Sequence, residues 1–388
     1  TDVGLTRAHA EYIKDENLGS LKAYMKIQLL LRYGSTVSRD FETVSKEFSE
    51  KLLGTDTSVS DEELYTMQLQ GAMPEYIGKL YSERFFSEEA KQDVTKMAME
   101  IVDFYKERIG ALTWMSDTTK AAALKKLDTL MIKVGYPDSF ACPADQAEIV
   151  SPENGGSYFD NTVRLKKAEK DYNAKLLYEP VDKSEWALEP FTLNACYTAT
   201  SNDITFPAAI LQAPLYDVNA SFEENLGGIG FIIAHEITHA FDNNGAKFDE
   251  NGNAADWWTP EDYNTFNDFC ADMIAFYDGY EGIPGIPMNG TLTLSENIAD
   301  QGAVQCITEI ESRRVSPDFK TLYTSFAKCM AAITTRAYAQ YAATFDYHSD
   351  AKLRVNRCVV NCPEFYEAFS ITENDGMWVA PENRVRVW

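Results

Sequence analysis

Residues 227–242 read GGIGFIIAHEITHAFD, and the rest of the 388-residue chain has to be built around this stretch. Its apolar residues recur at the spacing of a buried helix, and the polar cluster DNNG at 242–245 is a signal to end that helix. His235 and His239 stand four residues apart, so one helical face would carry both imidazoles with Glu236 beside them. This spacing lets two histidines reach one metal ion while the glutamate acts as a base. The stretch therefore predicts a zinc site.

A structural role for these histidines is the main alternative, since a single histidine is more often a hydrogen-bonded structural residue than a ligand. That alternative is weak because the chain has four histidines and two of them fall in this motif. A catalytic zinc needs three protein ligands. The metzincin spacing would require glycine at Asp242 and histidine at Gly245, and neither is present. Classes with a closely spaced glutamate would require it near Trp258 or Thr259, where there is none.

The next candidate for the third ligand is Glu296, in the stretch SENIAD at 295–300. Ser295 is expected to cap a helix, in which four-residue spacing puts the carboxylates of Glu296 and Asp300 on one face. Glu296 would bind the metal, and Asp300 would orient a ligand, because carboxylates commonly accept the free N–H of a zinc-bound histidine. A solvated acidic start of a helix would explain Glu296 alone but not the pair.

Composition excludes several classes of protein. With 45% hydrophobic and 24% charged residues, the chain is typical of a soluble globular protein, long enough for two lobes. Its formal charge of -25 argues against nucleic-acid partners and anionic membranes. The seven cysteines are scattered without a Cys-x-x-Cys pair, which favours a reducing compartment over a disulfide scaffold or a thiolate zinc site. No apolar run is long enough to be a membrane segment.

The first part of the chain has helical periodicity. The pattern of apolar residues predicts helices from 17 to 109, with a break at GAMPEY, 71–76. A capping residue in DTTK, 117–120, is expected to precede a further helix over 121–132. Residues 139–190 contain turn clusters and are expected to be irregular connecting structure.

A β-rich stretch follows at 191–210. It ends in ITFP, 204–207, where the proline confines any strand to the edge of a sheet or to a strand end. An edge strand can pair with an extended peptide, so this stretch is a candidate for substrate binding.

Five segments distributed along the chain carry a recognisable set of motifs. They are WMSDTTK at 114–120 with GYP at 135–137; NACY at 194–197 running to FPAAILQ at 206–212; the stretch 227–242; ENIAD at 296–300; and DYH at 346–348 with RVN at 354–356. Together they resemble the family of neprilysin and endothelin-converting enzyme, zinc metallopeptidases whose bacterial members are oligopeptidases. The resemblance runs along essentially the whole chain.

The resemblance implies a role for each of the matching polar residues. His235, His239 and Glu296 would bind one zinc ion per chain, and Glu236 would be the general base. His348 would stabilise the tetrahedral intermediate, Arg354 would hold a substrate carbonyl, Asn194 and the backbone of Ala195 would pair with the peptide, and Asp242 and Asp300 would orient the zinc ligands. His9 is left without a role and is expected on the surface.

The resemblance also implies an architecture. We expect a mainly α fold with a small β component (α+β), formed by the C-terminal part of a helical lobe at 1–138 and a thermolysin-like catalytic lobe at 139–388. The family's peptidase domain is longer upstream, so a preceding segment, or a separate chain that supplies it, is an expected partner. Gln68 and Val385 stand where vertebrate members have cysteine, which favours a microbial member that is cytoplasmic, cell-associated or secreted.

The function expected from these residues is hydrolysis of short peptides, by analogy on the amino side of a hydrophobic residue. Two alternatives remain open. One is a binding or scaffold protein that keeps the zinc site without turnover. The other is a zinc hydrolase for another class of substrate, against which the stretch at 194–197 favours a peptide.

Overall fold

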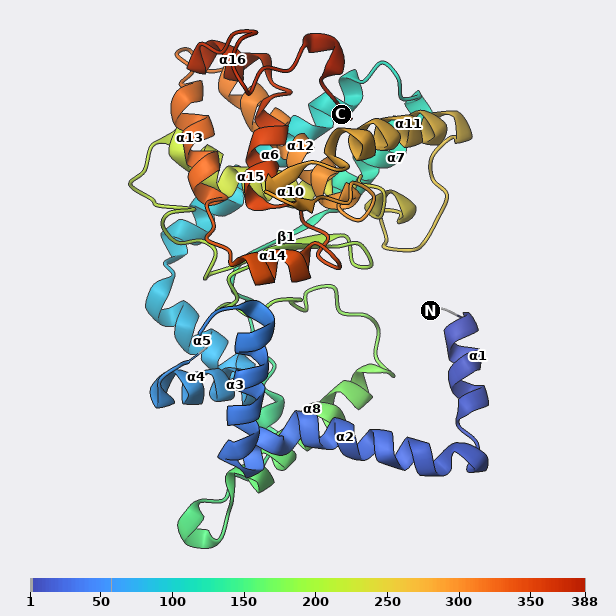
Figure 1. Cartoon of the computed structure of the whole chain (residues 1–388), viewed down its shortest axis with the longest axis vertical. Helices are drawn as coiled ribbons and strands as arrows, with labels where there is room; N and C mark the ends of the chain where they lie inside the picture. The colour runs from blue at the N-terminus through green and yellow to red at the C-terminus, as the bar shows by residue number, and fades with distance from the viewer. Residues whose placement is uncertain (1–2, 57, 388) are drawn as a thin grey trace. The chain divides into compact units, whose positions relative to one another are not determined.

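The computed structural model describes residues 3–56 and 58–387, in which the chain is mainly helical with two small sheets (Figure 1). The predicted mainly α class with a small β component is therefore confirmed. No helix among these residues is long and apolar enough to cross a lipid bilayer.

The chain forms two compact units. The first comprises Thr1–Met73 and Cys142–Val181, and the second comprises Pro74–Ala141 and Asp182–Trp388. These units are defined by contact and do not have the bounds of the lobes predicted at 1–138 and 139–388. The assignment of a helical and a catalytic lobe stays a prediction.

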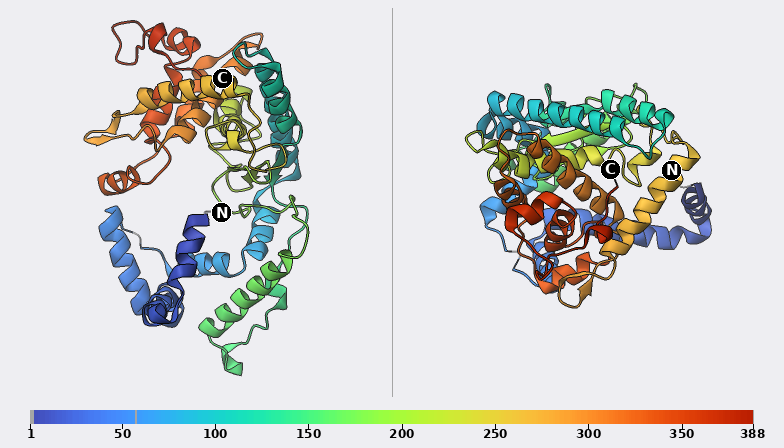
Figure 2. Two further views of the ribbon diagram at one scale, coloured as in Figure 1. Left: turned by 90° about the vertical axis from the view of Figure 1, so that its right-hand side faces the viewer. Right: turned by 90° about the horizontal axis from the view of Figure 1, so that it is seen from above.

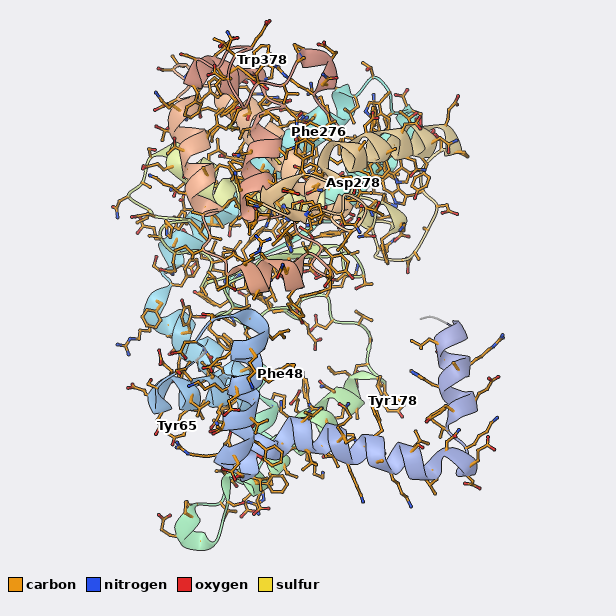
Figure 3. All side chains as sticks on the ribbon, in the orientation of Figure 1. Phe48, Tyr65, Tyr178, Phe276, Asp278 and Trp378 are labelled. Carbon is orange, nitrogen blue, oxygen red and sulfur yellow. The ribbon has the colours of Figure 1, made fainter. Side chains whose placement is uncertain are left out.

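The described residues of the first unit form helices joined by loops, without a β-strand. Its helices are α1 (Val3–Tyr12), α2 (Leu18–Val37), α3 (Arg39–Leu53), α4 (Asp61–Ala72) and α8 (Tyr158–Leu176). Ser38 and Ser60 begin α3 and α4, since each side chain accepts a hydrogen bond from the first turn. Exposed aromatic side chains such as Phe48 (66% exposed) and Tyr65 (49%) are common on these helices (Figure 3).

Helix α8 contradicts the irregular structure predicted for residues 139–190. Its N-cap, Ser157, accepts a hydrogen bond from the backbone of Asp160. The helix buries only Thr162, Leu165 and Ala168, so its apolar stripe is too narrow to produce a clear periodic pattern in the sequence.

The hydrophobic core lies in the second unit; among the described residues, the main buried cluster takes no side chain from 3–73 or 142–181. Helix α6 (Glu88–Ala111) begins at the N-cap Ser87 and buries one face through Val94, Ala98, Ile101, Tyr105 and Ile109. With α7 (Asp117–Asp128) it runs along one side of this unit (Figure 2). The predicted break at 71–76 is confirmed, because α4 ends at Ala72 and α5 (Pro74–Phe85) begins at Pro74.

The helix predicted at 121–132 has the expected length but lies four residues earlier in the chain. It begins one turn earlier, with Ser116 as the N-cap that accepts a hydrogen bond from Thr119 N, and it ends at Asp128. Residues Met131–Gly135 instead form strand β1, because they pair in parallel with β3 (Asp203–Pro207). Pairing with a strand about 70 residues away is a tertiary effect that local propensity does not report.

Three strands form the larger sheet, in the order β1-β3-β2. β3 is therefore the central strand, buried throughout, and the edge position considered for it is wrong. Pro207 is its last residue, in agreement with the second option, a strand end. The edge is formed by β2 (Cys196–Thr198), which pairs antiparallel with β3.

The rest of the second unit is helical apart from a small hairpin. The remaining elements are α9 (Phe222–Asn225), α10 (Phe231–Thr238), α11 (Pro260–Tyr277), β4 (Glu281–Ile283), β5 (Ile286–Pro287), α12 (Leu294–Ser312), α13 (Phe319–Cys329), α14 (Arg336–Ala342), α15 (Ala351–Val359) and α16 (Pro363–Phe369). Helices α10 and α12 form the most extensive helix pair and lie together in Figure 1. Thr293, not Ser295, is the N-cap of α12, so the predicted cap is wrong by two residues.

Candidate metal centre

The segment that carries both motif histidines enters α10 through a π-helix, Leu226–Gly230. Its glycines allow close backbone contacts: a Cβ on Gly227 would lie 2.3 Å from the carbonyl oxygen of Leu322, and one on Gly228 would lie 2.2 Å from that of Leu215. Any side chain at these two positions would push the segment away from its neighbours. The glycines thus seat α10 in the middle of the core.

Tyr105 of α6 holds α10 from behind. Its hydroxyl donates to Ala234 O at 3.1 Å and lies 2.6 Å from the Thr238 hydroxyl. Gly302 brings α12 against the same residue of α10, because a Cβ there would lie 2.7 Å from the Thr238 side chain. This close packing places Glu296 of α12 opposite the two histidines of α10.

Three side chains converge at the junction of α10 and α12. The Nε2 atoms of His235 and His239 are 3.0 Å apart, and Glu296 Oε2 lies 3.2 Å from the first and 3.5 Å from the second. The three residues are a group able to hold a metal ion, with ligand atoms within 4.8 Å of one another. His235, His239 and Glu296 therefore form the candidate zinc site predicted from the sequence.

The geometry of this group fits a zinc ion. With metal–ligand bonds of about 2.0–2.1 Å, neighbouring ligand atoms of a tetrahedral site are about 3.3 Å apart, close to the observed separations. Glu296 Oε2 is buried, with the Nε2 atoms of His235, His239 and His348 within 3.5 Å of it. A buried carboxylate is costly unless positive charge beside it neutralises it, which a metal ion between the imidazoles would do.

Each histidine has a carboxylate oxygen within 3 Å of its other nitrogen. His239 Nδ1 donates to Asp242 Oδ2 at 2.7 Å, and His235 Nδ1 lies 2.9 Å from Asp300 Oδ1. This is the arrangement that fixes the tautomer of a metal-binding imidazole and leaves Nε2 for the metal. The orienting roles predicted for Asp242 and Asp300 are compatible with it.

The electrostatics of the group favour positive charge at its centre. Burial alone would raise the pKa of the Glu296 carboxyl, but His235, His239 and His348 hold that pKa well below its usual range. For His239 the directions are reversed: burial lowers the pKa of the imidazole, but Asp242 and Glu296 raise it well above its usual value. The carboxylates of Glu296, Asp242 and Asp300 thus surround the two imidazoles with negative charge, which favours a cation between them.

Asp300 connects the candidate zinc site to a second cation. Arg354 of α15 donates from Nε and Nη2 to the two carboxylate oxygens, both at 2.7 Å. Burial raises the pKa of Asp300, but Arg354 and His235 together lower it to about 2. The carboxylate is completely buried and stays ionised between its two partners.

A cleft of about 640 Å³ opens in front of this group. Nine of the ten predicted site residues line it: Asn194, Ala195, His235, Glu236, His239, Asp242, Glu296, His348 and Arg354. The tenth, Asp300, lies behind the ligands and does not line the cleft. His348 approaches from the chain before α15, with Nε2 3.2 Å from Glu296 Oε2 and Nδ1 2.9 Å from Asp346. His9 is exposed on α1, as predicted.

Asn297 belongs to the motif ENIAD at 296–300, but the sequence did not indicate a role for it. It is buried on α12, where its amide donates to Thr293 Oγ1 at 2.9 Å and its carbonyl accepts from Ser349 Oγ at 2.7 Å. It thereby ties the residue after His348 to the helix that carries Glu296. Tyr105, by contrast, had no signal in the sequence because its contacts lie about 130 residues away.

Comparison with known proteins agrees with this geometry. Two models described as "Peptidase family M13" match residues 4–137 and 194–385. The chain is 35% identical over 97% of its length to a neutral endopeptidase of Lactobacillus helveticus, covering 58% of that protein, and 30% identical over 95% of its length to mouse neprilysin, covering 51% of it.

Solved structures give the same result. The crystal structure of PepO from Lactobacillus rhamnosis HN001 superposes with a TM-score of 0.90 at 33% identity, over 98% of this chain and 60% of that one. The chain thus spans somewhat more than half the length of the bacterial relatives that it matches. Because both family models, the sequence relatives and this structure agree along nearly the whole chain, the chain belongs to peptidase family M13.

Proposed function

We propose that the chain carries the catalytic centre of a zinc-dependent endopeptidase that hydrolyses short peptides. The observation that carries the proposal is the convergence of His235 Nε2, His239 Nε2 and Glu296 Oε2 within 3.5 Å of one another, next to Glu236 in one cleft. A zinc ion bound there would supply Lewis-acid chemistry that activates water and polarises a carbonyl.

Glu236 is the general base in this proposal. It follows the ligand His235 on α10, lines the cleft and is only 6% exposed. A carboxylate in this position takes the proton of the attacking water and later returns it to the leaving amine. Both transfers occur on the cleft side of α10, where the substrate lies.

His348 and Arg354 are proposed to hold the oxygen of the scissile carbonyl as negative charge develops on it. The His348 side chain is 47% exposed and lines the cleft, with Asp346 fixing its Nδ1. Asp300 uses two of the five N–H donors of Arg354, which leaves others for a substrate carbonyl. A preorganised donor of this kind is typically worth about 3 to 4 kcal/mol in the transition state.

The peptide is proposed to bind along β2. This strand is at the edge of its sheet, and Asn194 and Ala195 just before it line the cleft. An extended peptide can pair with the backbone of an edge strand, which supports the pairing role proposed for Asn194 and the backbone of Ala195. This geometry also favours a peptide over other substrates of zinc hydrolases.

A preference for cleavage on the amino side of a hydrophobic residue is the finer part of the proposal. Five apolar side chains of the cleft lining support this preference, because they could contact a hydrophobic side chain of the substrate: Ile210, Leu215, Phe231, Ile232 and Met330. Replacing a leucine after the scissile bond by aspartate is expected to lower kcat/KM, since the carboxylate would be buried without a partner.

The test is hydrolysis of a quenched fluorescent peptide by the chain, with and without a zinc chelator, beside Glu236→Gln. The substitution keeps the shape of the side chain but removes the base, so kcat should fall by about 10²- to 10⁴-fold. Zinc content, measured in parallel, should stay at one ion per chain.

Two outcomes would count against the proposal. Peptide hydrolysis that survives both the chelator and Glu236→Gln would mean that another group, or a contaminant, is the catalyst. No hydrolysis despite stoichiometric zinc would favour a binding role, or a requirement for the part of its relatives that this chain does not cover, supplied as a partner segment.

A further inference from the structure

Lys126 of α7 has the most buried cationic side chain of the described residues in the core, at 1% exposure. Its ammonium donates to three backbone carbonyls: Ala240 O at 2.8 Å, Gly245 O at 2.8 Å and Phe248 O at 2.9 Å. A lysine has three N–H donors, so all of them are used. A buried ammonium is tolerated only with such complete pairing.

The three carbonyls belong to the turn that follows α10, which we call the 240–248 turn. Ala240 lies just after the C-cap of α10, His239, where the negative end of the helix dipole favours a cation. The turn is tight: a Cβ on Gly245 would lie 1.9 Å from the carbonyl oxygen of His239. The ammonium of Lys126 therefore hydrogen-bonds to both ends of the turn and to its middle, next to the end of α10.

The same turn carries Asp242, which orients a zinc ligand. Asp242 Oδ1 accepts from the backbone N–H of Asn244 at 2.7 Å and of Gly245 at 2.6 Å, while Oδ2 accepts from His239 Nδ1. Gly245 is shared, because its N–H binds Asp242 and its carbonyl binds Lys126. The path from Lys126 to His239 thus runs through one residue of the turn and one carboxylate.

We infer that Lys126 is a positioning residue for the metal centre: its ammonium fixes the 240–248 turn so that Asp242 holds His239 in the orientation that binds zinc. The inference rests on the proposed zinc-dependent function but concerns a residue outside the cleft, since Lys126 does not line it. Lys126 acts through Asp242 and touches neither substrate nor metal.

The first test is zinc affinity, measured with the metal alone by competition with a chromogenic chelator. Lys126→Met should weaken zinc binding by about 10- to 100-fold, the range for loss of a group that orients a ligand. The matched control is Lys125→Met, which removes the neighbouring charge of α7, an exposed lysine that pairs with Glu250 at the surface. The control should change the affinity by less than about twofold.

A double-mutant cycle separates positioning from a general loss of stability. In an Asp242→Ala background, Lys126→Met should change zinc affinity by less than about threefold, because the group through which it acts is gone. The visible absorption of the Co²⁺-substituted chain, which reports the ligand geometry, should shift in Lys126→Met and stay unchanged in Lys125→Met. Equal losses of zinc affinity in both backgrounds, or an unshifted spectrum, would overturn the inference.

Folding is monitored by circular dichroism for every variant. If Lys126→Met does not fold, Lys126→Arg takes its place, because it keeps the charge but not the three-way geometry; it should weaken zinc binding by at least about threefold, and an unchanged affinity would overturn the inference. Wild-type chain that binds no zinc at all would sink the proposed function, whereas wild-type binding with unaffected variants would sink this inference alone.

Discussion

The two imidazoles of the metal centre are supported in different ways. His239 is held by Asp242, three residues further along the same turn, whose other oxygen accepts two backbone N–H groups. His235 is held by Asp300, which comes from another helix and is itself held by Arg354. The first support is local, and the second depends on tertiary packing. Substitutions should therefore affect stability more on the His235 side, and zinc affinity on both sides.

The largest effect on stability is expected from Asp300→Ala. It leaves the Arg354 guanidinium, whose side chain is only 16% exposed, without its partner, which costs about 3 kcal/mol of unfolding free energy. Urea unfolding of the metal-free chain measures this loss. Asp300→Asn is the matched variant, because it keeps the shape of the side chain while removing its charge. If Asp300→Ala lowers the free energy of unfolding by less than Asp242→Ala does, the comparison between the two sides is contradicted.

Gly302→Ala should cause the next largest loss of stability, because it disturbs the packing of α10 against α12 on which the support of His235 depends. Its Cβ would lie 2.7 Å from the Thr238 side chain, and overpacking of this kind costs about 1 to 3 kcal/mol. Zinc affinity should fall as well, since α12 carries Glu296.

The control for Gly302→Ala is Gly110→Ala near the end of α6, where an added Cβ meets nothing within 4 Å. That change should stabilise the chain slightly, because alanine favours a helix by about 1 kcal/mol over glycine. If both substitutions have the same effect on unfolding, close approach of α10 and α12 is not what aligns the ligands.

Asp242→Ala should lower stability less than Asp300→Ala, because the imidazole of His239 can lose its proton when its carboxylate is removed, whereas the guanidinium of Arg354 cannot. The expected loss is about 1 to 2 kcal/mol, together with a 10- to 100-fold loss of zinc affinity. Chelator competition and urea unfolding on one preparation give both numbers. Loss of stability without loss of zinc affinity would mean that the turn does not orient His239.

The smallest effect is expected from Asn297→Ala, which touches neither support. It removes the acceptor of Ser349 Oγ, worth about 1 kcal/mol, and loosens the segment that carries His348. We expect kcat to fall several-fold while zinc affinity stays unchanged. Steady-state kinetics with zinc titration would show this, and Ser349→Ala should reproduce it.

Most of the candidate site could be predicted from the sequence because its spacing is local. The four-residue spacings of His235 with His239 and of Glu296 with Asp300 fix which side chains share a helical face, whatever surrounds them. The resemblance to the family predicted the further cleft residues. Of these, His348 and Arg354 line the same cleft as the three candidate zinc ligands.

The errors in the fold have a common physical cause. β1 replaces the end of a predicted helix because strand pairing is decided by residues far along the chain. The same long-range pairing decides that β3 is central with Pro207 at its end, where the proline allowed either an edge or a strand end. Lys126 was missed for the same reason: its partners lie more than a hundred residues away, and a lysine in a helical run is usually an exposed one.

The position of β2 at the edge of its sheet has a consequence for the free molecule. An edge that can accept a peptide also presents unpaired backbone groups to any other strand, including that of another copy. β2 is only three residues long, so such pairing would form few hydrogen bonds and would not propagate. The shortness of the strand thus limits pairing of two copies through β2, while leaving the edge open to the peptide proposed to bind there.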